Sequence, residues 1–109
     1  MNYNVFYTEN FRKDAKRLAK KHSSLKRDIE ILIGSLEKDP VQGKPLGKDC
    51  FKIRMAISSK RKGKSGGARV ITCVLIEDTE VYLLAIYDKS EKEDIPDKEL
   101  KMLRNQVGL

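Results

Sequence analysis

The stretch FKIRMA, residues 51–56, marks the point where the hydrophobic period of the chain changes. Apolar side chains alternate here with basic or small ones, which is typical of a strand with one buried face. The side chains of Lys52 and Arg54 then share the other face, which we expect to meet solvent. Before this stretch the apolar residues recur with the helical period of about 3.6 residues. After it they form runs typical of strands, so the sequence predicts an α+β fold.

The residues before the stretch predict one strand and two helices. Residues 3–7 combine aromatic and β-branched side chains, which favours a short first strand. Apolar residues recur at helical spacing over residues 10–21 and again over 25–38. The second helix must end before Asp39-Pro40, because the residue preceding proline disfavours the helical conformation. We expect the N-caps to be Thr8 or Asn10 for the first helix and the Ser23-Ser24 pair for the second.

The residues after the stretch predict two more strands and a short last helix. Residues 40–49 hold two prolines and two glycines and are expected to form a loop. Residues 58–67 are expected to form a mobile basic hairpin loop between strands 51–56 and 69–76. Residues 77–79 form the next turn, strand 80–87 follows, and an inner face of Ile95, Leu100, Leu103 and Val107 defines the last helix. These elements predict a single domain over 1–109, with a helix hairpin packed on a mainly antiparallel sheet in two layers.

Length and composition exclude several classes of protein. The chain has 109 residues and a formal net charge of +7, and no apolar run approaches the ~20 residues that span a bilayer. The first residues lack the pattern of a signal peptide. Cys50 and Cys73 are too few for a disulfide scaffold and match no zinc spacing, so we interpret them as packing residues rather than catalytic thiols. We therefore expect a reduced, cytoplasmic protein with no membrane partner.

Positive charge is concentrated in two segments. Residues 12–27 hold eight basic residues and one acidic residue, and residues 44–69 hold nine basic residues and one acidic residue. The remaining residues carry a net negative charge. Two basic segments of this kind indicate a surface that binds a polyanion, most simply nucleic acid. The alternative is a solvated surface that keeps the protein soluble, and this alternative fits the helical segment better than the second one.

The second basic segment offers phosphate chemistry. Lys52 and Arg54 share a strand face, and Arg69 begins the neighbouring strand. The intervening loop adds four more cations. A fixed cluster of guanidinium and ammonium groups suits the scissile phosphate of RNA, because it also stabilises the extra charge of the transition state. The loop residues that we expect to bind RNA are Lys60, Arg61, Lys62 and Lys64.

Other residues limit the mechanism. His22 is the only histidine, which excludes a ribonuclease with two catalytic histidines, and we expect it to cap a helix end or to be solvated. No group of carboxylates lies beside the basic strands, so no metal site and no cofactor are expected. Proton transfer then falls to lysine, tyrosine or glutamate. Tyr82 and Tyr87 are an odd number of residues apart, so only one should face the basic surface; Tyr87 either stacks on a base, shuttles a proton or packs in the core.

Three segments resemble a known family: residues 49–54 (DCFKIR), 62–71 (KGKSGGARVI) and 82–91 (YLLAIYDKSE). Together they are similar to the RelE/ParE superfamily of type II toxins, with the HigB-like RelE-type toxins as the closest branch. The resemblance implies the two-layer RelE-like fold and an endoribonuclease that cuts mRNA on the ribosome without a metal or cofactor. It also implies a cognate antitoxin, and contact with operator DNA only through the toxin–antitoxin complex.

The resemblance also implies roles for individual residues. Lys52 and Arg54 match the basic strand pair that includes the suspected general base, and Arg69 matches the arginine on the scissile phosphate. Lys89 and Lys92 match RNA-binding positions after the last strand. The chain departs from the family pattern at Ser90, where the family has an arginine, and near residues 95–96, where it lacks the catalytic tyrosine. Tyr87 or Glu91 is our candidate for the missing general acid.

Two other functions stay open at this point. One is the other arm of the superfamily, whose toxins poison DNA gyrase and do not cleave RNA. The second is a catalytically silent module that binds nucleic acid or an antitoxin, which the departures at Ser90 and residues 95–96 favour. The basic face of the sheet favours the nuclease.

Overall fold

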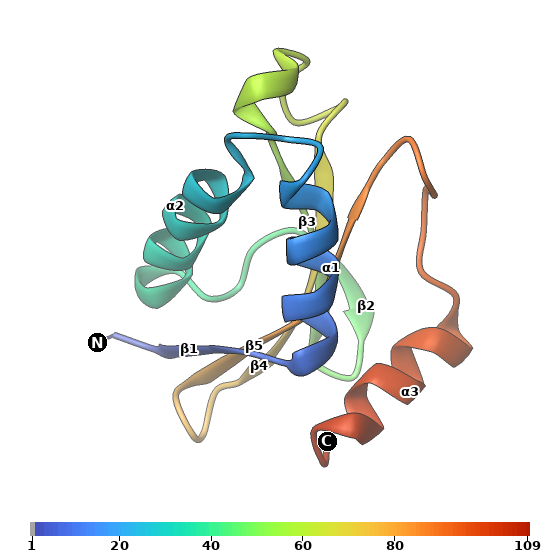
Figure 1. Ribbon diagram of the computed structural model, residues 1–109. Helices are drawn as coiled ribbons and strands as arrows, with labels where there is room; N and C mark the ends of the chain where they lie inside the picture. Colours follow the sequence, from blue (N-terminus) through green and yellow to red (C-terminus); the bar gives the residue numbers. More distant parts are fainter. Residues whose placement is uncertain (1) are drawn as a thin grey trace.

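The computed structural model describes residues 2–109 and contains three α-helices, a short 3-10 helix and one five-stranded sheet (Figure 1). The elements in chain order are β1 (Asn4–Tyr7), α1 (Glu9–Ala19), α2 (Leu25–Lys38), β2 (Lys44–Gly47), β3 (Cys50–Met55), η1 (Ser58–Lys60), β4 (Ala68–Leu75), β5 (Glu80–Asp88) and α3 (Asp97–Gln106). The sheet order is β1-β5-β4-β3-β2. β1 pairs with β5 in parallel, and all the other pairs are antiparallel. The predicted α+β class with a mainly antiparallel sheet is confirmed.

The helix hairpin begins and ends close to the predicted residues. The side chain of Thr8 accepts a hydrogen bond from the Phe11 amide at 3.1 Å, so Thr8 and not Asn10 caps α1. Ser24 is the N-cap residue of α2, but its side chain makes no capping hydrogen bond. Its hydroxyl lies 2.8 Å from a carboxylate oxygen of Asp28 instead. The prediction that the Ser23-Ser24 pair supplies the N-cap residue of α2 is therefore confirmed, although the hydroxyl does not bond a backbone amide of the helix.

One strand lies where the sequence predicted only a loop. Residues 44–47 pair with the start of β3 and form the edge strand β2. Gly43 precedes it with a φ of +90°, and a Cβ there would lie 2.3 Å from the carbonyl oxygen of Lys52. Proline and glycine are tolerated here because an edge strand bonds a neighbour on one side only. Their presence hid the strand from the sequence pattern.

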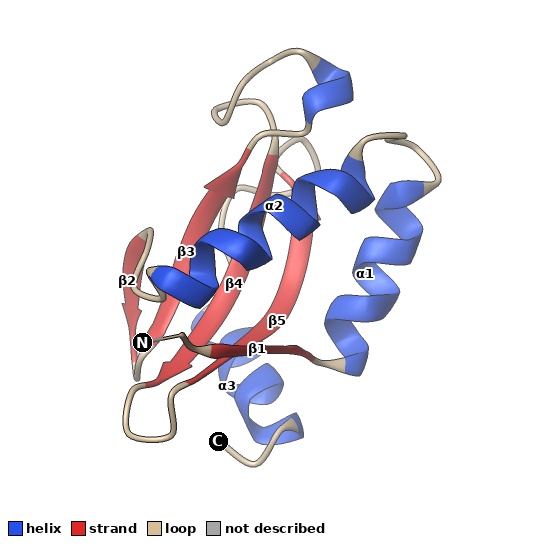
Figure 2. Cartoon of the chain, turned by 90° about the vertical axis from the view of Figure 1, so that its left-hand side faces the viewer, coloured by secondary structure: helices blue, strands red, loops and turns tan. Residues whose placement is uncertain are grey.

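The sheet has a hydrophobic core on each face. α1 and α2 cover one face (Figure 2), with Leu18, Leu36 and Ile53 in the first core. α3 packs on the other face through Leu100 and Leu103, which form the second core with strand residues. The helix hairpin therefore packs as predicted, but the face expected to meet solvent is partly covered by α3. Cys50 and Cys73 lie opposite each other in this second core as buried free thiols, as expected for packing residues.

A β-bulge in β5 changes the direction of its side chains. Ile71 pairs with Ala85 while Thr72 pairs with Leu83, so Leu84 is an extra residue. Leu84 and Ala85 consequently both belong to the second core. The side chains after the bulge therefore lie on the opposite face from the one that uninterrupted alternation would give them. Tyr82 and Tyr87 therefore lie on the same face of the sheet. The parity argument that placed only one of them on the basic face is wrong, because it assumed a strand without a bulge.

No helix among residues 2–109 has the length and apolar content needed to cross a lipid bilayer.

Candidate nucleic-acid interface

Three neighbouring strands bring the predicted cations to one end of the sheet. Arg54 on β3 lies opposite Arg69 on β4, and Arg69 lies opposite Tyr87 on β5. Lys52 precedes Arg54 by two residues and so shares its face. The strand register therefore gathers these four side chains on the face of the second core, as the alternation of residues 51–56 indicated.

Arg54 is exposed and borders a cleft between α2 and the edge of β3. The cleft has a volume of about 770 Å³. Its apolar lining includes Ile31 and Leu32, and its charged lining is one carboxylate and four cations: Asp28, Lys44, Lys52, Arg54 and Lys64. The excess of cations over carboxylates favours an anionic ligand.

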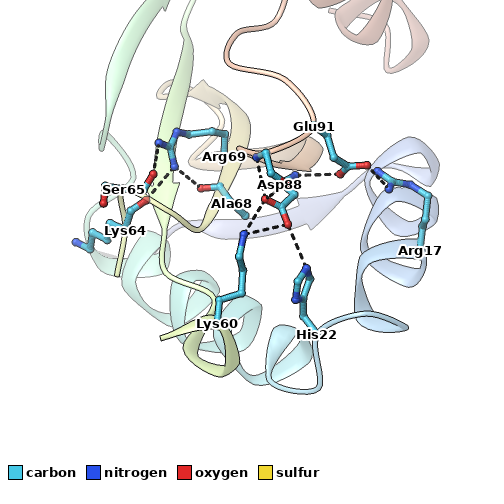
Figure 3. Close-up of polar contacts among 10 residues, drawn as sticks. Arg17, His22, Lys60, Lys64, Ser65, Ala68, Arg69, Asp88 and Glu91 are labelled. Carbon is cyan, nitrogen blue, oxygen red and sulfur yellow. Dashed lines mark hydrogen bonds and ion pairs between the residues drawn. The ribbon is translucent and has the colours of Figure 1, made fainter. Parts of the chain in front are cut away.

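Arg69 is buried, and its guanidinium is bonded to the protein itself (Figure 3). Only 4% of the residue is exposed. Nη1 donates to the carbonyl oxygens of Lys64 at 2.9 Å and Ala68 at 3.1 Å, and Nη2 donates to that of Ser65 at 3.3 Å. This structure thus turns Arg69 towards the loop carbonyls and does not present it at the surface.

Lys52 is paired with a carboxylate from the segment that follows β5. Its ammonium group donates to Asp94, and the side chain is 14% exposed. The hydrogen bond from Lys52 and its charge lower the pKa of Asp94. A ligand phosphate that reaches Lys52 must therefore compete with Asp94.

Tyr87 is packed in the second core and is 4% exposed. Its hydroxyl donates to the carbonyl oxygen of Glu93 at 3.5 Å, and the ammonium of Lys92 lies 4.9 Å from the ring centroid. Burial raises the pKa of Tyr87, and the charge of Asp94 raises it further. Of the three roles considered from the sequence, core packing is the one that this position fits.

Glu91 lies on the side of α1, next to Arg17 (Figure 3). Its carboxylate accepts a hydrogen bond from Arg17 at 2.8 Å and another from the Asp88 amide at 3.3 Å. Burial raises the pKa of Glu91, but the hydrogen bonds from Arg17 and the backbone outweigh it, so the pKa lies below its ordinary value. An ionised carboxylate paired with arginine is poorly suited to act as a general acid.

The cations of the loop and of the segment after β5 fall into two groups. Arg61, Lys62, Lys64 and Lys89 are exposed. The ammonium group of Lys60 donates hydrogen bonds to both carboxylate oxygens of Asp88, at 2.9 and 3.2 Å. That of Lys92 donates to both carboxylate oxygens of Glu99, at 2.9 and 3.1 Å. The first group can reach a ligand directly, whereas the second is already paired with carboxylates.

Two buried carboxylates, Asp28 and Asp88, were missed by the sequence reasoning. Asp28 is 6% exposed and Asp88 is 5% exposed. A signal for Asp28 was present, because it stands three residues after Leu25 and four before Leu32, on the apolar stripe of α2. Asp88 ends β5 among other polar residues and carried no such signal.

The only histidine also has a different place from the one expected. His22 Nε2 lies 3.1 Å from Asp88 Oδ2, and the side chain is 15% exposed. The ring therefore neither caps a helix end nor lies free in solvent. Over residues 2–109, no three histidine, cysteine, aspartate or glutamate side chains are arranged to hold a metal ion.

Comparison with known proteins places the chain in a family. The family described as the RelE toxin of the RelE/RelB toxin-antitoxin system matches residues 3–108. The toxin–antitoxin complex RelBE2 from Mycobacterium tuberculosis is 25% identical, covers 81% of this chain and 92% of its own, and has a TM-score of 0.61. A free mutant of the E. coli toxin RelE is 16% identical, covers 98% and 99%, and has a TM-score of 0.66. The RelE–RelB complex from Pyrococcus horikoshii is 21% identical, covers 84% and 100%, and has a TM-score of 0.56.

A helix hairpin on a five-stranded mixed sheet, with cations gathered at one end, is thus the architecture of a small toxin fold. The chain belongs to the RelE toxin family of type II toxin-antitoxin systems. The family that the three segments predicted is confirmed over nearly the whole chain. The HigB-like branch stays a prediction.

Proposed function

We propose that this toxin is a ribosome-dependent mRNA endoribonuclease that needs no metal ion. The observation that carries the proposal is that Lys52 and the exposed Arg54 share one face of β3, next to the exposed cations of the loop. Membership of the RelE family supports the substrate class. The ribosome would hold the mRNA in the reactive geometry, which explains how a site made mostly of cations can suffice.

The proposed reaction is attack of a ribose 2′-hydroxyl on the adjacent phosphate. The 2′-oxygen forms a bond to phosphorus, the bond from phosphorus to the 5′-oxygen breaks, and the leaving oxygen takes a proton. The products carry a 2′,3′-cyclic phosphate and a 5′-hydroxyl. After separating from Asp94, the positive charge of Lys52 would favour loss of the 2′-hydroxyl proton to water, and the exposed Arg54 would stabilise the phosphorane.

The placement of the other predicted residues refines this proposal. The sequence divided the phosphate contact between Arg54 and Arg69, and the exposed Arg54 is the better candidate for direct contact. Tyr87 and Glu91 are poorly placed to protonate the leaving oxygen, because one is buried and the other is paired with Arg17. We propose that charge stabilisation carries most of the catalysis and that the ribosome or water supplies the proton.

The partner would be an antitoxin encoded beside the toxin. The M. tuberculosis and P. horikoshii relatives were solved as RelE–RelB complexes. The cleft with Ile31 and Leu32 among four cations fits an antitoxin segment that is both apolar and acidic. Operator DNA would be bound through the complex. Co-purification with the neighbouring gene product, and loss of mRNA cleavage in that complex, would check this.

Primer extension on a defined mRNA tests the proposed function. The purified toxin is incubated with the mRNA in the presence and absence of translating ribosomes. We expect cuts only with ribosomes, and we expect Arg54→Ala to reduce the cleavage rate about 100-fold, as for loss of one transition-state donor. Arg27→Ala is the matched control. Arg27 is also an exposed arginine, but it lies on α2 and is not part of the proposed site, so its loss should leave the cleavage rate unchanged.

Other outcomes would replace the proposal. A 5′-phosphate on the products would contradict attack by the 2′-hydroxyl. Intact mRNA together with gyrase-dependent DNA cleavage would assign the chain to the gyrase-poisoning toxins. Salt-dependent RNA binding without cleavage would identify a silent binding module.

A further inference from the structure

The loop between β3 and β4 carries the exposed cations that follow Arg54 in the chain, and buried groups hold this loop at several points. The loop covers residues 56–67, contains η1 and leads into the start of β4, where Arg69 lies. We propose that Asp28, Asp88 and Arg69 are positioning residues that fix the shape of this loop, and that Lys60 belongs to this clamp and does not contact RNA. The inference rests on the proposed function, because it assigns the loop a role in binding the RNA substrate.

Asp28 holds the start of the loop. Its Oδ1 accepts a hydrogen bond from the Ser58 hydroxyl at 2.6 Å, and its Oδ2 accepts one from the Ser58 amide at 2.9 Å. The Ser59 amide donates to the hydroxyl of Ser24 at 2.8 Å, next to Asp28. Burial raises the pKa of Asp28, but the hydrogen bonds from Ser58 and Ser24 lower it more. The carboxylate is thus ionised and ties η1 to the first turn of α2.

Asp88 holds the next residues through Lys60 (Figure 3). The ammonium group of Lys60 bonds both carboxylate oxygens, at 2.9 and 3.2 Å, and its side chain is only 16% exposed. Ser90 adds hydrogen bonds from its amide and its hydroxyl, both 3.0 Å long. Burial raises the pKa of Asp88, but the hydrogen bonds from Ser90 and Lys60 bring it to about 2. Lys60 therefore joins the loop to the end of β5 and is committed to that contact.

Arg69 and Gly67 hold the end of the loop. The guanidinium of Arg69 donates to the carbonyl oxygens of Lys64 and Ser65, and the Lys89 amide donates to that of Gly67 at 3.0 Å. Gly67 lies so close to β3 that a Cβ there would be 2.2 Å from the Met55 carbonyl oxygen. The loop thus returns to the sheet along a fixed path.

The clamp divides the basic loop into two kinds of cation. Arg61, Lys62 and Lys64 stay exposed while their backbone is held by the buried groups. A loop that is ordered before binding loses less conformational freedom when RNA arrives, so its cations bind more tightly. Lys60 therefore keeps the loop ordered, whereas the exposed cations that follow it contact the RNA.

The variant Asp88→Asn distinguishes a role of Asp88 in holding the loop from a direct effect of its negative charge on RNA binding. The substitution removes a negative charge beside the basic surface, so electrostatics alone would tighten RNA binding. The clamp predicts the opposite: weaker binding of a fluorescein-labelled 20-nucleotide single-stranded RNA. It also predicts about tenfold faster trypsin cleavage after Arg61, Lys62 and Lys64, because the open form of the loop becomes more populated. Cleavage after the exposed Lys101 in α3 is the internal control.

Lys60→Met and Lys62→Met form a matched pair within the loop. Each variant removes one lysine, but only Lys62 is expected to contact phosphate. We expect Lys62→Met to reduce the slope of log Kd against log salt by about 0.7, the value for one contact to a single strand. Lys60→Met should weaken binding with the slope unchanged and should expose the loop to trypsin. The slope thus distinguishes a lysine that contacts phosphate from one that only holds the loop.

Each outcome decides the proposal. Tighter RNA binding by a folded Asp88→Asn protein with unchanged trypsin cleavage would overturn it, and so would equal slope changes in the two lysine variants. If Asp88→Asn fails to fold, trypsin cleavage of the Lys60→Met loop decides in the same way. The trypsin measurement needs no RNA, so a wild-type protein that neither binds nor cuts RNA would refute the proposed function separately.

Discussion

Gly67, at the end of the loop between β3 and β4, lies where the backbone of β3 leaves no room for a side chain. A Cβ at this position would lie 2.2 Å from the Met55 carbonyl oxygen and 3.0 Å from the Ala56 Cα. Both are backbone atoms, so the clash can be relieved only by moving the strand. We expect Gly67→Ala to lower the free energy of unfolding by about 2 kcal/mol, measured by urea denaturation.

Gly34 provides the control for this prediction. It lies in the middle of α2, and a Cβ there would meet no atom within 4 Å. Alanine favours a helix over glycine by about 1 kcal/mol, so Gly34→Ala should raise the stability. If both substitutions shifted the urea midpoint in the same direction, the close approach of Gly67 to β3 would not be what limits this position.

Individual residues also show why sequence reasoning about the site was incomplete. The shared face of Lys52 and Arg54 followed from strand alternation alone. The burial of Arg69 did not, because its partners are backbone carbonyls of a loop whose path depends on the tertiary fold. The same holds for His22, which meets Asp88 across 66 positions of the chain. Such contacts leave no local pattern in the sequence.

At the scale of elements, prediction succeeded where one periodic pattern covers a whole helix or strand. α2 was predicted with its observed bounds because its apolar stripe is regular and Pro40 ends it. β2 was missed because an edge strand tolerates the glycine and proline that usually indicate a loop. The bulge at Leu84 was missed because a single extra residue changes the facing of β5 without changing its composition.

The docking of α3 gives a prediction at the same scale. Leu103 is 3% exposed in the second core, whereas the adjacent Met102 is 52% exposed. Leu103→Asp should undock α3 and uncover the thiols of Cys50 and Cys73, which are 1% and 0% exposed. We expect their reaction with a disulfide reagent such as DTNB to accelerate at least about tenfold, because it then proceeds through a more populated open form.

Met102→Asp is the control, since it places the same charge on the outer face of the same helix. Its thiols should react at the wild-type rate. If the thiols reacted with DTNB at equal rates in the two variants, the packing of α3 would not be what shields Cys50 and Cys73 from the reagent.

At the scale of the whole molecule, the sheet is shared by two cores, and buried carboxylates tie the parts together. Asp28 joins α2 to the loop, and Asp88 joins the end of β5 to the loop and to His22. In a chain whose net charge is +7, the buried carboxylate of Asp88 offsets the charge of Lys60, whereas Asp28 accepts hydrogen bonds from serine groups. The sequence predicted the cations and their strand face, but the anions that hold them were set by tertiary packing.

This arrangement makes the stability of the whole protein sensitive to acid. The pKa of Asp88 is about 2 in the folded protein and 3.8 as its ordinary value, and the pKa of Asp28 is lowered as well. A lowered pKa contributes stability that is fully present above about pH 5 and is lost as the pH falls towards 2. For Asp88 this contribution is about 2 kcal/mol.

Urea denaturation between pH 6 and pH 2 measures it. We expect the wild-type free energy of unfolding to fall over this range and Asp88→Asn to show a shallower fall, because its amide does not titrate. Asp97→Asn removes an exposed carboxylate from α3 and should leave the wild-type curve unchanged. Parallel curves for Asp88→Asn and the wild type would mean that the carboxylate of Asp88 is not what couples folding to protons. The acid sensitivity would then come from other carboxylates whose pKa is lowered, among them Asp28, Glu91 and Asp94.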